Sequence, residues 1–352
     1  ESDPMNIQWQ PQPGEDRPVQ KIIVHRATIR SDMISIFKDP DVINYNLYAT
    51  VIDMRGKEEA GEGIGVMRDI LTQFWHEVYN ALTTGASERS PVIRHDMQKD
   101  EWQALARVIL YGFCTLNYFP LRMSPVIIVT CLFGEEVLSR QFLLEAFRKY
   151  VTSEDQKVFD ACLSDDCDVN DEDIVDFLSA WRCCRIPTTD NIKDIMFELA
   201  HQELVQKPRY VVHCWSPVIK MLQFDESFQT FDGVLRLFME KQPTAKKVLK
   251  ALEVETSNEI ERLTLDHLKR YIRSLEGKAI ERFLHFITGA DCLTGNPIKV
   301  IFNSLSGLQR RPISHTCGPT LEVPTTYESF ADVASEFNNI LKDEQAWSFD
   351  IV

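Results

Sequence analysis

Cys317 differs from the other cysteines of the chain in the residues that surround it. It lies in the polar segment RRPISHTCGPT (310–320), where two arginines lie upstream, His315 and Thr316 come directly before the thiol, and a Gly-Pro pair follows. A nearby cation favours the thiolate, which is the nucleophilic form of cysteine. The glycine leaves backbone room for a bulky acyl group. This pattern indicates a nucleophile that forms a thioester, and a structural thiol is the alternative interpretation of the same segment.

A thiol hydrolase is a further interpretation of the same cysteine. Such an enzyme needs a histidine within hydrogen-bond reach of the thiol and a third group that orients the histidine. His315 and Cys317 point the same way if the segment is extended, because alternate residues of a strand share a face. The other histidines show no signature of a known hydrolase family, so this interpretation stays open.

The remaining cysteines form neither a metal-binding nor a disulfide pattern. Their total of nine is odd and their spacing is irregular, in a chain of 352 residues that is long enough to need no covalent staples. Cys162-x4-Cys167 and the adjacent pair Cys183-Cys184 lack the second pair of ligands that a structural zinc site needs. The N-terminus shows no apolar signal segment. We therefore expect reduced thiols, an intracellular location in the cytoplasm or the nucleus, and neither a metal nor another cofactor.

The segment GEGIGVMRD (61–69) raises the possibility of a phosphate-binding loop. Its glycine spacing does not match the dinucleotide fingerprint, and no strand–helix–strand alternation surrounds it. A nucleotide loop of the other common kind would end in Gly-Lys-Ser/Thr, whereas this one ends in Met67-Arg68. The segment therefore predicts a glycine turn that leads into a helix near Val66.

Charge and hydropathy exclude two classes of partner. The formal net charge of −15 argues against a surface that follows nucleic-acid phosphates. The longest apolar run, SPVIIVTCLFG (124–134), is too short to span a bilayer and predicts a buried segment. We therefore expect no nucleic acid and no membrane among the partners.

The elements that position Cys317 follow from the periodicity of the apolar residues. Residues 21–37 predict a short strand that continues into a helix capped near Ser31 or Asp32, and 47–54 predict another strand. From residue 66 helical spacing dominates, with one strong apolar face formed by Ile70, Leu71, Phe74, Trp75, Val78 and Leu82. Further helices are expected over 101–119, 136–150, 171–184, 190–206, 229–240 and 259–288, the last broken near Glu276-Gly277.

After Gly289 the pattern changes to short strands, at 297–305 and at TLEVP (320–324), separated by a loop that carries Cys317. Thr325 and Glu328 predict a capping box in front of a final helix, whose apolar stripe is Phe330, Val333, Phe337, Ile340 and Leu341. The fold class expected is α+β. An N-terminal arm covers 1–20, a mostly helical lobe 21–250 and a small α+β lobe 251–352, with a hinge near 245–260.

Several motifs, in order along the chain, resemble the HECT-type ubiquitin-protein ligases. RPISHTC (311–317) resembles the family's LPxxHTC signature around its active cysteine. ERFLHFITGADCL (281–293) is similar to the family's rllqFvTGtsr helix end, and GEGIGVMRDILTQFW (61–75) resembles GGVxREWFxLLS. Similar motifs elsewhere extend the resemblance over about residues 21 to 352. Single motifs are weak, whereas the ordered set is specific.

This resemblance implies a bilobal HECT-like fold and a defined chemistry. Cys317 would accept ubiquitin from a ubiquitin-conjugating enzyme as a thioester and pass it to lysines of protein substrates. His315 and Thr316 would support the thiol locally. Phe349, which stands fourth from the C-terminal end, would help to orient the lobes or the acceptor.

The sequence departs from the family pattern at three places. Gly318-Pro319 replaces a common Phe-Asn pair, and Arg68-Asp69 replaces Arg-Glu. The subdomain on which the conjugating enzyme docks is expected to be reduced to the acidic stretch SDDCDVNDED (164–173), which implies a divergent member with a shortened N-lobe. The alternative function is therefore a catalytically impaired HECT-fold scaffold that binds ubiquitin or protein partners.

Overall fold

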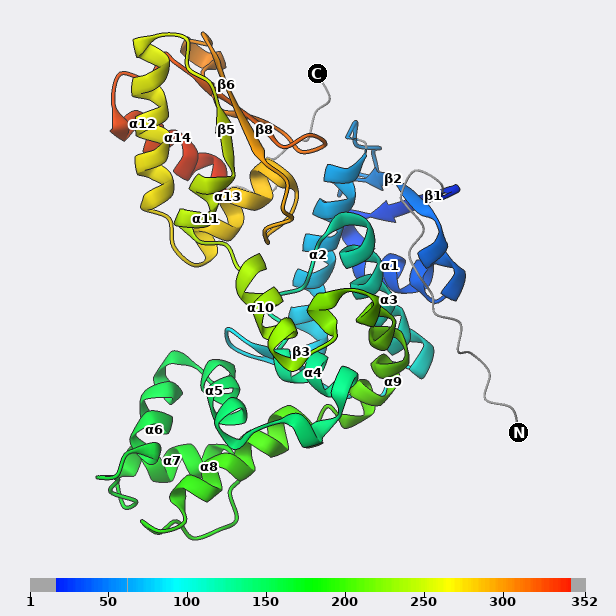
Figure 1. Cartoon of the computed structure of the whole chain (residues 1–352), viewed down its shortest axis with the longest axis vertical. Helices are drawn as coiled ribbons and strands as arrows, with labels where there is room; N and C mark the ends of the chain where they lie inside the picture. The colour runs from blue at the N-terminus through cyan, green and yellow to red at the C-terminus, as the bar shows by residue number, and fades with distance from the viewer. Residues whose placement is uncertain (1–16, 62, 343–352) are drawn as a thin grey trace. The chain divides into compact units, whose positions relative to one another are not determined.

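The computed structural model describes residues 17–61 and 63–342, so Phe349 and most of the predicted arm lie outside the described residues (Figure 1). The described chain has a mixed α+β structure in which helices dominate and the strands form small sheets. It divides into two compact units. The helical unit consists of Glu77–Arg107 and Leu121–Phe238, and the cysteine unit consists of 17–76, Val108–Pro120 and 239–342. The lobes predicted over 21–250 and 251–352 are a different division of the chain and stay a prediction.

A two-stranded parallel sheet begins the cysteine unit. β1 (Val19–His25) pairs with β2 (Asn46–Ile52), and alternate side chains of both strands are buried. Three short helical elements connect them: a 3-10 turn over Arg26–Thr28, α1 over Ile29–Phe37 and a second 3-10 turn over Pro40–Asn44. The predicted strands within 21–37 and 47–54 are thus confirmed.

The first helix begins earlier than its sequence predicts. α1 starts at Ile29, ahead of the expected cap at Ser31 or Asp32. The Asp32 carboxylate instead accepts a hydrogen bond from the backbone N–H of His25 at 2.8 Å. This contact ties the first turn of α1 to the end of β1.

Two long amphipathic helices follow. α2 (Ile64–Leu82) and α3 (Lys99–Leu116) confirm the helical periodicity, and the predicted face of α2 is buried at Ile70, Leu71, Phe74, Trp75, Val78 and Leu82. The boundary between the units falls after His76 in α2 and after Arg107 in α3. The first turns of α2 therefore belong to the cysteine unit.

The helical unit confirms the helices predicted over 136–150, 171–184, 190–206 and 229–240 and adds others. β3 (Thr83–Gly85) and β4 (Arg89–Pro91) form an antiparallel pair. The helical segments are α4 (Pro125–Phe133), α5 (Arg140–Tyr150), α6 (Ser153–Leu163), α7 (Glu172–Ala180), α8 (Ile192–His201), α9 (Arg209–Ile219) and α10 (Phe231–Lys241), with a π-turn over Gln202–Gln206 and 3-10 turns over Glu135–Val137, Lys220–Phe224 and Glu226–Phe228. α10 ends in the cysteine unit.

The apolar run at 124–134 forms the buried helix α4, as predicted. Across the part of the chain that the structure describes, no helix is long and apolar enough to cross a membrane. A 30 Å hydrocarbon core requires about 20 apolar helical residues, and α4 has 9.

Helices α5 to α8 pack around a core of their own. Phe147 is fully buried in this core and contacts the rings of Phe159 and Trp181, at centroid distances of 5.4 Å and 5.2 Å. The acidic stretch 164–173 forms the connection between α6 and α7 and the first residues of α7. The region is therefore more than that stretch, because the stretch lies within a block of four helices that share an apolar core.

The rest of the cysteine unit places helices beside a four-stranded sheet. The sheet order is β5-β6-β8-β7, with β5 (Leu252–Val254), β6 (Ile298–Asn303) and β8 (Thr320–Pro324) parallel and β7 (Ile313–His315) antiparallel to β8. The helices are α11 (Ala245–Ala251), α12 (Glu259–Arg273), α13 (Lys278–Thr288) and α14 (Phe330–Lys342), with a 3-10 turn over Gly307–Gln309. The expected loop between the strands thus contains β7, a strand too short to show an alternating pattern.

One apolar core holds these C-terminal elements together. Tyr271 stacks on Phe337 at 5.1 Å between ring centroids, and Phe283 packs beside both. Its buried residues all come from 248–341. The predicted break between α12 and α13 is confirmed: α12 ends at Arg273, and α13 begins directly after Gly277, whose positive φ of 50° favours glycine.

The predicted capping box at the start of α14 is wrong. The backbone N–H of Thr325 donates to the Asn303 carbonyl at 2.9 Å, which extends the pairing of β6 with β8. α14 begins five residues later, and the Ser329 hydroxyl accepts from the N–H of Asp332 at 3.3 Å. Sheet pairing therefore overrides a local cap signal.

Ser329→Ala should weaken α14, because it removes the cap of the first turn. We expect a loss of about 1 kcal/mol in local stability, read as faster amide hydrogen exchange across 330–342. Glu328→Ala is the matched control, since Glu328 is exposed and the capping box that would have used it does not form. Equal effects of the two changes would contradict this assignment of the cap.

Candidate functional site

Cys317 lies in the turn of the hairpin that joins β7 to β8. His315 pairs with Thr320 across the hairpin, so the turn consists of Thr316 to Pro319. The turn is fixed on its far side, where the Pro319 carbonyl accepts from the backbone N–H of Lys299 at 2.9 Å. Cys317 is exposed, whereas Thr316 beside it is only 4% exposed. The Cys317 thiol is thus exposed in the turn, whereas Thr316 and Pro319 on its two sides are held in place.

His315 is oriented by a carboxylate. Its Nε2 donates to Glu322 Oε1 at 2.7 Å, and Glu322 Oε2 accepts from the side-chain amide of Asn303 at 3.2 Å. Nε2 must be the donor here, because an ionised carboxylate only accepts. A histidine two residues from the thiol therefore has a third group that fixes its ring, and Glu322 is a residue that the sequence did not indicate.

The glycine segment packs directly against the cysteine turn. A methyl group on Gly63, whose φ is +88°, would lie 3.3 Å from Cys317 Sγ. A methyl group on Gly65 would lie 2.2 Å from Thr316 Oγ1. The prediction of a glycine turn that leads into a helix is confirmed, with α2 starting at Ile64. What the sequence did not reveal is that these glycines let the first turn of α2 approach the thiol.

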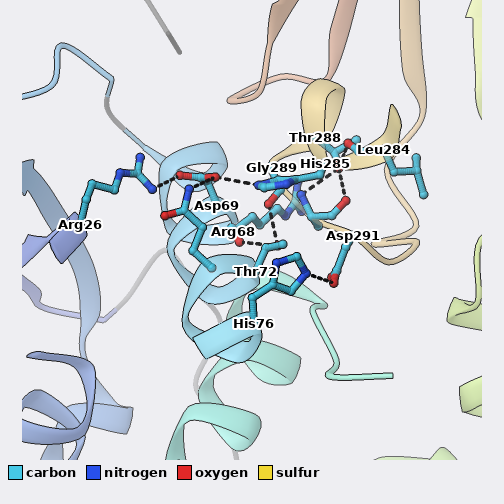
Figure 2. Close-up of polar contacts among 12 residues, drawn as sticks. Arg26, Arg68, Asp69, Thr72, His76, Leu284, His285, Thr288, Gly289 and Asp291 are labelled. Atoms are coloured by element: carbon cyan, nitrogen blue, oxygen red, sulfur yellow. Dashed lines mark hydrogen bonds and ion pairs between the residues drawn. The ribbon is translucent and has the colours of Figure 1, made fainter. Parts of the chain in front are cut away.

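A buried charge lies one turn further along α2. Asp69 is 1% exposed, and its carboxylate receives Arg26 at 2.5 Å and the Nε2 of His285 at 2.7 Å (Figure 2). Arg26 also makes a two-pronged contact with Glu59 at 2.8 Å and 2.7 Å. One buried carboxylate therefore connects the 3-10 turn after β1, α2 and α13.

The pKa values of this cluster show that both charges are retained. Burial alone would raise the pKa of Asp69, but the charge of Arg26 and the hydrogen bond from His285 outweigh it and hold that pKa below its usual range. Burial likewise opposes the charge of Arg26, and its contacts with Glu59 and Asp69 more than compensate, so its pKa is raised. The cluster is an ionic network in the interior.

The end of α13 fits closely against α2. Gly289 has a φ of +76°, and a methyl group there would lie 2.3 Å from the Gly65 carbonyl oxygen. The Thr72 hydroxyl lies 2.9 Å from the Gly289 carbonyl oxygen, and His76 lies 3.7 Å from the Asp291 carboxylate (Figure 2). Only glycine allows both this backbone angle and this approach.

Arg68 makes its hydrogen bonds outside the ionic network of Asp69. It is 3% exposed and donates to the Leu116 carbonyl at 3.3 Å, and burial lowers its pKa. Arg68 and Asp69 thus have separate roles, one in packing α2 against the end of α3 and the other in the contact with α13.

The structure places the predicted residues Cys317 and Thr316 in one turn and His315 at the end of the strand that leads into it, whereas Phe349 lies outside the described residues. Gly63, Gly65, Asp69 and His285 were not predicted as parts of this site. The one local signal was the glycine spacing, which is unusual for an ordinary helix start. Within 17–61 and 63–342, no group of three or more His, Cys, Asp or Glu side chains could hold a metal ion.

A scan against protein-family models and a search of curated proteins found no match to this sequence.

Gly65→Ala should displace the cysteine turn, because its methyl group would overlap Thr316. We expect amide exchange across 313–318 to rise at least tenfold, which corresponds to about 1.4 kcal/mol of lost local stability. Gly318→Ala is the control within the same turn, since a methyl group there meets nothing within 4 Å. Unchanged exchange in Gly65→Ala would show that α2 does not hold the turn.

Asp69→Asn should make the stability of the chain less sensitive to acid. The pKa of Asp69 is lowered from 3.8, so its charge stabilises the fold fully above that pH and loses this effect as the pH falls through the lowered value. At about pH 7 the variant should be less stable by about 3 kcal/mol, as when one partner of a buried ion pair is removed. This difference, measured from urea unfolding of both proteins, should shrink at about pH 2. A gap that does not change with pH would contradict the role of the charge.

Proposed function

We propose that the chain is a HECT-type ubiquitin-protein ligase, a transferase that carries ubiquitin as a thioester on Cys317 and passes it to substrate lysines. The observation that carries the proposal is the exposed thiol in the β7–β8 turn, within the motif that resembles LPxxHTC. An exposed thiol in a turn whose flanking residues are fixed suits a nucleophile that must meet two large partners.

The proposed reaction has two acyl transfers. The Cys317 thiolate attacks the thioester carbonyl of ubiquitin on the conjugating enzyme, a new carbon–sulfur bond forms, and the thiolate of the conjugating enzyme leaves. A substrate lysine amine then attacks the new thioester, an isopeptide forms, the amine loses its proton, and Cys317 leaves as a thiolate. Exchange between thioesters is nearly balanced in energy, so the site needs access and positioning more than a strong base.

The residues around Cys317 have distinct roles in this proposal. Glu322 holds the ring of His315 beside the turn, which makes His315 a positioning residue and a source of positive charge when it is protonated. Thr316 is packed against Gly65 and fixes the direction of the turn. By resemblance, Phe349 orients the lobes or the acceptor during lysine attack.

The bilobal arrangement belongs to the proposal as well. An N-lobe over 21–250 and a C-lobe over 251–352 would turn about the hinge near 245–260, and the conjugating enzyme would dock on the block of α5 to α8. The acidic connection 164–173 in that block is complementary to a basic docking surface. The proposed location is the cytoplasm, the nucleus or both, where ubiquitin transfer to cellular proteins takes place.

A non-reducing gel after incubation with a panel of charged conjugating enzymes tests the proposal. The wild type should give an adduct that reductant removes, Cys317→Ser an oxyester that survives reductant, and Cys317→Ala none. Cys184→Ser is the matched control, because Cys184 is also an exposed thiol and should leave the adduct intact.

No adduct with any enzyme of the panel would overturn the ligase proposal. Ubiquitin binding that persists in Cys317→Ala, without an adduct in the wild type, would support the scaffold instead. Cleavage of a ubiquitin thioester probe without any donor enzyme would point to the thiol hydrolase, whose oriented histidine the His315–Glu322 pair provides.

A further inference from the structure

We propose that the contact between Asp69 and His285 is a reversible latch that holds the Cys317 turn against α2 and thereby controls access to the thiol. The contact joins two elements that are 216 residues apart in sequence, at 2.7 Å between a carboxylate oxygen and a ring nitrogen (Figure 2). The control of ubiquitin transfer by this latch rests on the proposed function. The mechanical part, which couples His285 to the reactivity of Cys317, does not.

The segment that would move has its own core. All buried residues of the C-terminal cluster come from 248–341, and the cluster includes residues of α12, α13, α14, β6 and β8. α13 belongs to this packed body, and the Cys317 turn is joined to it through β8. Releasing α13 from α2 would therefore carry the turn with it and would leave the body's apolar core intact.

Several polar contacts fasten this body to α2. They include His285 to Asp69, the Gly289 carbonyl to Thr72, and the backbone approach of Gly289 to Gly65. Polar contacts between parts of one chain exchange readily for contacts with water, and relative motion is the ordinary expectation for such a joint.

The buried carboxylate of Asp69 keeps charged partners whether the latch is closed or open. When His285 leaves, Asp69 retains Arg26 at 2.5 Å, and Arg26 retains its two contacts with Glu59. These three residues belong to 17–76, so the ionic network stays complete on the side that does not move. Opening thus costs the charge-assisted hydrogen bond of His285 together with the contacts of Thr72 and Gly65 to Gly289, and it leaves no isolated buried ion.

The closed latch covers one side of the nucleophile. A methyl group on Gly63 would contact Cys317 Sγ, and Gly65 lies against Thr316, so the segment that leads into α2 covers that side of the sulfur. The side chain of Cys317 is exposed on its other side. Opening would uncover the sulfur fully and allow the turn to present a bound acyl group to a second partner.

Alkylation of Cys317 by iodoacetamide in the full chain, followed by mass spectrometry of the peptide that contains residue 317, tests the latch. His285→Ala should raise the alkylation rate about tenfold, which corresponds to 1.4 kcal/mol. His285→Gln should give a smaller increase, because its amide can still donate to Asp69. Cys184 is the internal reference and should react at the same rate in every variant, since it is exposed and belongs to the helical unit.

His267→Ala is the matched control. His267 lies in the same C-terminal body and packs edge-on against Phe330, so its loss weakens that body without removing a contact to α2. We expect its Cys317 rate to equal that of the wild type. An equal increase in His267→Ala and His285→Ala, or a parallel increase at Cys184, would show general loosening and would overturn the latch.

The failures of the latch and of the proposed function can be told apart. A ubiquitin adduct in the wild type with no change in alkylation upon His285→Ala would overturn the latch and leave the ligase intact. Faster alkylation with no adduct from any donor would support the latch and overturn the ligase. If His285→Ala speeds alkylation of Cys317 but leaves the rate of ubiquitin-adduct formation unchanged, the claim that the latch controls ubiquitin transfer is overturned.

Discussion

The buried carboxylate of Asp69 is the constraint on which the arrangement around Cys317 depends. An ionised carboxylate in the interior is costly unless nearby charges and hydrogen bonds replace its water, so partners must reach it from several directions. Arg26 reaches it from the 3-10 turn after β1 and His285 from α13. The contact of His285 with Asp69 fixes where α13 lies along α2. α13 in turn shares a core with β8, the second strand of the hairpin that carries Cys317.

Glycines convert this polar contact into a close backbone fit. Asp69 is four residues beyond Gly65, about one helical turn, so the charge and the close contact lie on neighbouring turns of α2. Gly289 closes α13 in the left-handed conformation, which brings its backbone onto the Gly65 carbonyl. A larger residue at either position would separate the helices and lengthen the contact between Asp69 and His285.

Local chemistry was readable from the sequence, and long-range contacts were not. Cys317, His315 and Thr316 are adjacent in the chain, so any turn places them together. The periodicity of α2 and α3 gave their buried faces, because burial of an amphipathic helix follows its own pattern. Nothing in a periodicity says which helix meets which, so a pair of residues 216 positions apart could not be found. The false capping box at Thr325 has the same cause, since pairing with Asn303 outweighed the local signal.

Exposure and fixed position normally oppose each other, and the β7–β8 turn reconciles them by anchoring the neighbours of the thiol. A buried thiol would be held well but out of reach, and its pKa would rise, as it does to about 12 for Cys292. Here Thr316 is anchored by α2 and Pro319 by Lys299 of β6, whereas Cys317 between them stays exposed. Because one of those anchors depends on α2 and the other on the body's own sheet, loss of the α2 contact would free one end of the turn and keep the other. That asymmetry gives the thiol a hinged attachment, which suits a group that must be held for one partner and released toward the next.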